Sequence, residues 1–189
     1  MRTIFLWFYC LPIGDAILLM LAATVCYLLL REKFRHMSWW KTGILLLFLV
    51  WILVILFGTL VQRTEGSKPG EAILTPFASY YAALNGGSKE LYRTNFMIVV
   101  LFYPAGLLGC QLLPKGWRGY QKILLMAGML GLISMGIEFA QYHLELGLAE
   151  TDDIIHNAFG AILGAAACMA KAVPPSKIIR FPSEDETAN

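Results

Sequence analysis

The uncharged stretch from Gly43 to Val61 is the feature that most limits what this chain can fold into. A bilayer has an apolar core of about 30 Å, and a helix of about 20 mainly apolar residues crosses it. Backbone polar groups inside that core must be bonded within the protein, which leaves helices and closed barrels as spanning structures. The stretch is therefore predicted to be a membrane-spanning helix.

Four further stretches have the same character, although Asp15 interrupts the first of them. They are approximately Leu6–Leu30, Phe96–Leu113, Ile123–His143 and Asp153–Val173. The whole chain is 58% hydrophobic and 15% charged, whereas soluble domains contain about 45–50% apolar and about 25% charged residues. We therefore predict an all-α fold, a polytopic membrane helical bundle with about five transmembrane helices.

Two kinds of function are not indicated by this composition. A net charge of +2, with basic residues scattered between apolar runs, gives no sign of nucleic-acid binding. The cysteines form no CxxC pair, and His143 and His156 match no ligand spacing, so neither a metal site nor any other cofactor is predicted. The cysteines all lie in apolar stretches, where they behave as small hydrophobic residues: Cys10, Cys26, Cys110 and Cys168.

The charges in the loops predict the orientation of the chain. Short cytoplasmic loops of membrane proteins are enriched in lysine and arginine. Basic residues gather in 31–41, in 115–122 and after the fifth span, whereas the loop Leu144–Asp152 has none. The loop Gln62–Asn95 carries both signs and does not follow the rule. We predict a multi-pass plasma-membrane protein with its N-terminus outside and its C-terminus in the cytoplasm.

The chain is predicted to have three regions: a two-helix membrane segment, a larger membrane domain and a polar cytoplasmic tail without fixed structure, at residues 1–71, 72–173 and 174–189. The larger domain opens with the sequence AILTPFASYYAALNGG, residues 72–87. This proline-led aromatic stretch is too short to span, and Tyr80 and Tyr81 suit the headgroup level. We expect a re-entrant or interfacial segment here.

The stretch Gly136–Gly164 is unusually polar for its apolar surroundings. Glu138 and Gln141 are three residues apart and share one face at the end of the fourth span. Asp153 and Asn157 are likewise neighbours in the first turns of the fifth span. Antiparallel helices joined by a short loop would bring these four groups to a similar depth, where they would form one polar pocket on the outer side.

The polar groups divide into catalytic and binding candidates. An ionisable group inside a span is energetically expensive and usually functional. Glu138, with Asp153 across the loop, is therefore the candidate for acid–base catalysis. The candidate binding residues are polar groups near these two carboxylates, namely Gln141, Asn157, Arg93 and Asn95.

Most of these groups also have a structural interpretation. Asp152 and Asp153 can cap the fifth helix and suit its dipole. Asn157 can hydrogen-bond a neighbouring helix, and Arg93 can extend its charged end to the membrane interface. Asp15 either faces the same pocket or marks the start of the first helix. The sequence leaves these alternatives open.

The segments LTPF, FYPAG, IEFAQ and DDIIHNAFGAILG occur in this order along the chain. Together they resemble the VanZ-like family over about Leu74 to Ala170. The resemblance implies that Asp153, Asn157 and Gly160 correspond to the Asp-x-x-x-Asn-x-x-Gly signature of that family. The IEFAQ segment corresponds to its E-x-x-Q helix, which includes Glu138 and Gln141 among the implied site residues.

Two positions depart from the family pattern. Many members carry an arginine shortly before the aspartate motif, and the loop Leu144–Asp152 contains none. Many also carry an asparagine six residues before the proline of FYPAG, where this chain has Ile98. Asn95 is the nearest amide that could replace it.

A named member of the family is associated with low-level resistance to teicoplanin, a glycopeptide that acts on lipid-linked peptidoglycan precursors outside the membrane. The resemblance implies a bacterial envelope protein whose partners are membrane lipids and either such a precursor or the glycopeptide. We expect it to modulate antibiotic binding or surface precursors without established catalysis. The sequence does not indicate an oligomeric state.

Two other functions remain open. One is a membrane enzyme on a lipid-linked or envelope substrate, in which Glu138 and Asp153 share the acid–base work and Arg93 holds a phosphate. The other is a small transporter or lipid flippase, with the polar pocket as its binding site.

Overall fold

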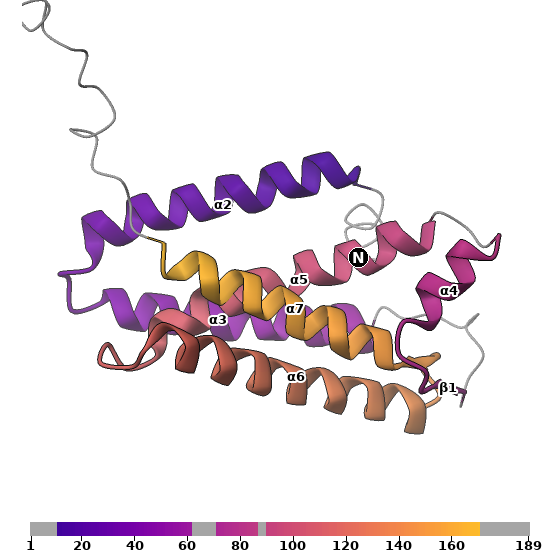
Figure 1. Cartoon of the computed structure of the whole chain (residues 1–189). Coiled ribbons are helices and arrows are strands. Elements are labelled where there is room, and N and C mark those ends of the chain that lie inside the picture. The colour runs from indigo at the N-terminus through magenta and orange to yellow at the C-terminus, as the bar shows by residue number, and fades with distance from the viewer. Residues whose placement is uncertain (1–10, 62–70, 87–89, 171–189) are drawn as a thin grey trace, which may run out of the picture.

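The computed structural model describes residues 11–61, 71–86 and 90–170 and is nearly all-α, which confirms the predicted fold class (Figure 1). The helices are α2 (Ile13–Phe34), α3 (Trp40–Leu56), α4 (Ala78–Leu84), α5 (Glu90–Leu112), α6 (Gly119–His143) and α7 (Thr151–Cys168). A π-helical turn, η1 (Phe57–Val61), continues α3. Cys10 and the predicted tail 174–189 lie outside the described residues.

Four helices in the described part of the chain are long and apolar enough to cross a membrane. They cover Ile13–Phe34, Trp40–Leu60, Leu91–Leu112 and Gly119–His143. The fifth predicted span is also a helix, α7, but it has 18 residues and five polar side chains among its first seven: Thr151, Asp152, Asp153, His156 and Asn157. Asp15 is exposed in the first turn of α2, as expected for a residue that marks a helix start.

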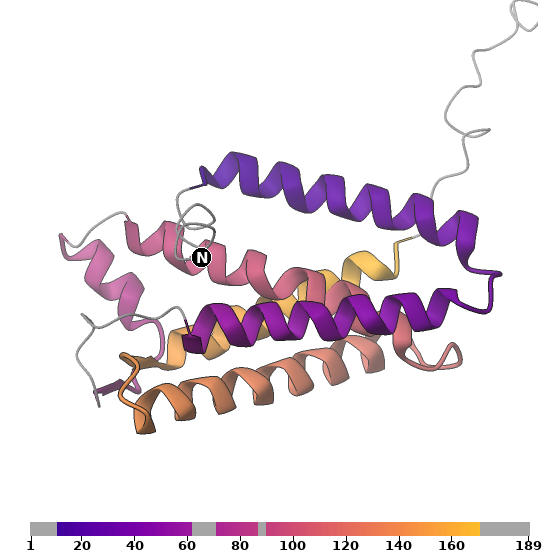
Figure 2. The same cartoon turned by 180° about the vertical axis from the view of Figure 1, so that it is seen from behind.

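The core of the bundle lies between α5 and α7. Seen from both sides, these two helices run through the middle, with α2 along one flank and α6 along the other (Figures 1 and 2). In the most apolar window of α5, 72% of the residues are buried, against 11% in α2 and in α3. The outer helices therefore present apolar side chains outward, as suits contact with lipid.

Glycine permits the close approach of α5 and α7. A Cβ atom on Gly164 would lie 2.0 Å from the carbonyl oxygen of Tyr103, and one on Gly106 would lie 2.2 Å from that of Ala161. Gly160 has the same relation to the carbonyl oxygen of Val99, at 2.3 Å. Small residues let helix backbones meet in this way. Gly160 and Gly164 of α7 thus pack against α5 within the protein.

The two ends of the bundle differ in their connections. The α2–α3 turn, the α5–α6 turn and the end of α7 share one end (Figures 1 and 2). At this end Arg31 donates to the carbonyl oxygens of Cys168 and Ala170, the second at 2.8 Å, so a cation caps the last turn of α7. The described basic loops, 31–41 and 115–122, therefore lie at the same end of the protein.

The opposite end contains α4, two short strands and the α6–α7 loop. Strands β1 (Ala72–Ile73) and β2 (Ala149–Glu150) pair in parallel, with Ala72 opposite Ala149. The sequence patterns did not predict this pairing, because two residues are too few for a strand signal. The predicted re-entrant or interfacial segment is a seven-residue helix, α4, beside this pair.

Candidate functional site

Asp152 occupies the centre of the polar contacts at this end. Its side chain is only 2% exposed. It accepts the backbone N–H groups of Phe77 and Ser79, the latter at 3.0 Å, and the hydroxyl of Ser79. The sequence predicted that Asp152 caps α7, but its carboxylate instead caps the distant helix α4. The N-cap residue of α7 is Glu150, which makes no side-chain cap bond. Sequence analysis gave the site role to its neighbour Asp153.

The same contact holds an uncommon backbone conformation. Phe77 has a φ of 62°, in the left-handed region that bulky residues rarely adopt. Such a residue persists only where its surroundings hold it. Here the carboxylate of Asp152 bonds the Phe77 N–H directly, so α7 determines how the chain enters α4.

Asn95 extends this contact to a third helix. Its Nδ2 donates to Ser79 Oγ at 2.8 Å, and its side chain is buried. A continuous series of hydrogen bonds therefore runs from α7 through Ser79 to α5. Asn95 lies one turn before Ile98, which is also buried. The predicted binding residue Asn95 thus has a partner inside the protein.

Glu138 and Gln141 are buried at the end of α6. Glu138 Oε2 accepts the backbone N–H of Glu150 at 2.9 Å, which ties α6 to β2. Gln141 Nε2 donates to the carbonyl oxygen of Thr59 at 2.9 Å. Thr59 lies in the π-helical turn, where helical hydrogen bonding is irregular and carbonyl groups become accessible to side chains.

Asn157 bonds a neighbouring helix. Its Nδ2 donates to Ser134 Oγ of α6 at 2.7 Å, and its Oδ1 has no hydrogen-bond partner among the described residues. Arg93 and Asp153 are half-buried, and both are engaged in interactions within the protein. The predicted groups therefore gather at one end of the bundle.

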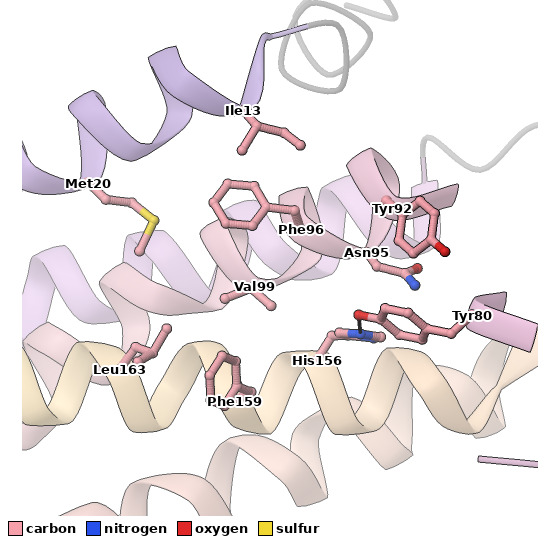
Figure 3. Close-up of a pocket in the computed structure, with 10 residues that line it drawn as sticks. All are labelled: Ile13, Met20, Tyr80, Tyr92, Asn95, Phe96, Val99, His156, Phe159 and Leu163. Atoms are coloured by element: carbon pink, nitrogen blue, oxygen red, sulfur yellow. Dashed lines mark hydrogen bonds between the residues drawn. The ribbon is translucent and has the colours of Figure 1, made fainter. Parts of the chain in front are cut away.

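A pocket of about 280 Å³ lies beside these contacts, between α2, α4, α5 and α7 (Figure 3). Asn95 lines it, whereas Glu138, Gln141, Asp153, Asn157 and Arg93 are not among its lining residues. Its walls are mainly apolar and come from three helices: Ile13, Met20, Phe96, Val99, Phe159 and Leu163.

One end of the pocket is polar. Figure 3 shows Tyr80, Tyr92, Asn95 and His156 together at that end. The hydroxyl of Tyr80 is 2.8 Å from His156 Nε2, and the two rings stack with centroids 5.6 Å apart. His156 Nδ1 is buried without a hydrogen-bond partner among the described residues. The pocket is therefore amphiphilic.

The sequence indicates other roles for Tyr80 and His156. It predicts Tyr80 at the headgroup level, and His156 is a candidate only as a metal ligand, for which its spacing from His143 does not fit. Among the described residues no group of three or more His, Cys, Asp or Glu side chains could hold a metal ion. Their separation of 76 positions along the chain explains why no local pattern links the two.

The family model described as VanZ/LLP1 matches residues 42–172, which is more than half of the chain. The match includes α3, N-terminal to the segments in which the resemblance is visible. No curated protein and no solved structure matches this chain significantly.

Proposed function

The chain belongs to the VanZ/LLP1 family, and from this premise we propose that it is a bacterial envelope membrane protein that contributes to teicoplanin tolerance. In this proposal the end of the bundle that includes α4 and the α6–α7 loop faces outward. It modulates access of the glycopeptide to lipid-linked precursors by binding, without catalysis. The family membership and the apolar helices support the membrane location.

The observation that best supports a binding role is the hydrogen bonding of the buried carboxylates. A general acid or base must reach the proton that it transfers. Glu138 instead accepts a main-chain N–H from β2, and Asp152 accepts N–H groups at the start of α4. These bonds connect loop segments to the helical core and hold the shape of this end. They support a preformed binding surface over acid–base chemistry.

The test is susceptibility of a Gram-positive host that carries the full chain, measured against the same host with an empty vector. We expect the minimal inhibitory concentration of teicoplanin to rise and that of a ribosome-directed antibiotic to stay unchanged. Membrane abundance is measured in parallel with a tagged chain. No change for teicoplanin at normal membrane abundance would refute the proposal.

A further inference from the structure

The pocket between α2, α4, α5 and α7 is a slot whose lining residues extend along the helices, from Met20 and Leu163 to Tyr80 (Figure 3). His156 and Leu163 mark two positions along its α7 wall, and their separation of seven positions corresponds to about 10 Å of helix. The volume of about 280 Å³ is at the lower end of small-molecule sites, which span about 300–1,000 Å³. A slot of this size takes one hydrocarbon chain rather than two.

The position of the slot between apolar helices suggests a source for such a hydrocarbon chain. Its α2 wall belongs to a helix of which only 11% of the most apolar window is buried. Its α5 wall belongs to another candidate membrane span. A pocket between two candidate membrane spans would border the acyl chains of the bilayer.

The polar end of the pocket provides hydrogen-bonding groups for the polar head of a ligand. His156 is 7% exposed and lines the pocket, yet its Nδ1 has no hydrogen-bond partner among the described residues. A buried polar atom left without a partner is unfavourable, and a ligand oxygen would satisfy it. The described residues that line the pocket include no lysine, arginine or carboxylate, so we expect an uncharged ligand group here.

We propose that this slot binds one acyl chain of a membrane lipid, with an ester or hydroxyl oxygen at the Tyr80–His156 end. The hydrogen bond with Tyr80 fixes the tautomer of the His156 imidazole, and the tautomer determines which ligand group Nδ1 can bond. If the Tyr80 hydroxyl donates to Nε2, then Nδ1 donates to an ester carbonyl oxygen, and in the other tautomer Nδ1 accepts from a hydroxyl. This site is distinct from the contacts of Glu138 and Asp152, and it does not depend on the role in antibiotic tolerance.

The test uses the full chain in lipid nanodiscs and a lysophospholipid with a photoreactive diazirine in its acyl chain. After irradiation, mass spectrometry locates the adducts. We expect them on the pocket walls of α5 and α7, around Phe96 and Phe159, and we expect unlabelled lysophospholipid to compete. Adducts spread over the outer faces of α3 and α6, without competition, would overturn the proposal because they describe bulk lipid only.

Variants separate the slot from the general lipid surface. Leu163→Trp fills the slot and is expected to remove most of the α5 adducts, whereas Leu132→Trp, at a 68% exposed position on α6, is the matched control and should not. Met20→Trp fills the slot from α2 and replaces Leu163→Trp if that variant does not fold. Equal labelling in all of the folded variants would overturn the proposal.

A separate experiment tests the contact between His156 and the polar head of the lipid. His156→Phe keeps an aromatic ring beside Tyr80 but removes both nitrogens. We expect competition by lysophospholipid to weaken about two- to tenfold, the range that one hydrogen bond contributes, while labelling by a headless photoreactive alkane persists. Unchanged competition would remove the head contact from the proposal. Competition by a polyprenyl phosphate but not by lysophospholipid would overturn the assignment to an acyl chain.

Discussion

Asp152, in the first turn of α7, accepts the backbone N–H of Ser79 at 3.0 Å across 73 positions of the chain. The first N–H groups of any helix lack partners within the helix, and a carboxylate is the group best suited to them. Here that carboxylate comes from another helix, because Phe77, at the N-cap position of α4, makes no side-chain cap bond. The position of α4 is therefore a property of the whole bundle.

Replacing Asp152 should release α4 from the bundle. Asp152→Ala leaves two main-chain donors and the Ser79 hydroxyl without their acceptor, and we expect a loss of at least about 2 kcal/mol of stability. Thermal unfolding in detergent measures this loss, and faster proteolysis within residues 71–86 locates it. Asp15→Ala removes an exposed carboxylate from α2 and is the control. Equal stability of the two variants would contradict the prediction.

Two substitutions of Glu138 distinguish a binding role from acid–base catalysis. Glu138→Gln keeps an oxygen that can accept the Glu150 N–H, so we expect normal stability and normal teicoplanin tolerance. Glu138→Ala leaves that N–H without its acceptor, with an expected loss of about 1–3 kcal/mol, and it should abolish tolerance while the protein still reaches the membrane. Susceptibility and membrane abundance are measured for both variants. Loss of tolerance in Glu138→Gln, at normal abundance, would instead support an acid–base enzyme.

A substitution of Asp153 tests the site that the family signature implies. Asp153→Asn is nearly the same size but lacks the charge, and we expect it to abolish teicoplanin tolerance without lowering membrane abundance. Susceptibility testing with a tagged chain measures both. Full tolerance at normal abundance would exclude Asp153 from the mechanism, and a parallel loss of abundance would make it a folding residue.

The α5–α7 contact should not tolerate larger residues. Gly164→Ala would place a methyl group 2.0 Å from the Tyr103 carbonyl oxygen, so the helices must separate. Overpacking of this kind costs about 1–3 kcal/mol, which thermal unfolding in detergent would detect. Gly136→Ala, on the exposed face of α6 with no atom within 4 Å, is the matched control and should be neutral. A neutral Gly164→Ala would show that this close approach does not contribute to stability.

The orientation of the chain can be tested with reporter fusions. The basic turns at one end of the bundle predict that this end is cytoplasmic. Alkaline phosphatase should be active when fused in the α6–α7 loop, near Gly147, and inactive when fused in the α5–α6 turn, near Gly116. A green fluorescent protein at the C-terminus should fluoresce. The reverse pattern would place the polar end inside and contradict the envelope proposal.

The sequence was most informative where the signal is local. A run such as Gly43–Val61 predicts a spanning helix by length and polarity alone, and α3 with its π-helical turn covers all of it. The burial of Glu138, Gln141 and Asn157 also followed from local reasoning, because a polar group on an apolar helix must turn inward. The site roles assigned to these residues remain predictions.

Local signals do not determine contacts between segments that lie far apart in the chain. Asp152 and Asp153 are adjacent and identical in type, so composition cannot choose between them. Successive residues of a helix differ by about 100° in direction, and the packing of α7 against its neighbours buries Asp152 and leaves Asp153 half-buried. The β1–β2 pair has the same origin, since neither two-residue strand exists without the other.

The sequence by itself thus determined the helices, their apolar character and the end of the bundle at which polar groups gather. These follow from the number of apolar residues in a row and from the desolvation of polar groups in lipid. Only the tertiary structure decided which atoms meet: Asp152 with the start of α4, Gln141 with the π-helical turn, and Tyr80 with His156. Each of these pairs joins separate segments, and their geometry is set by the phase and packing of whole helices.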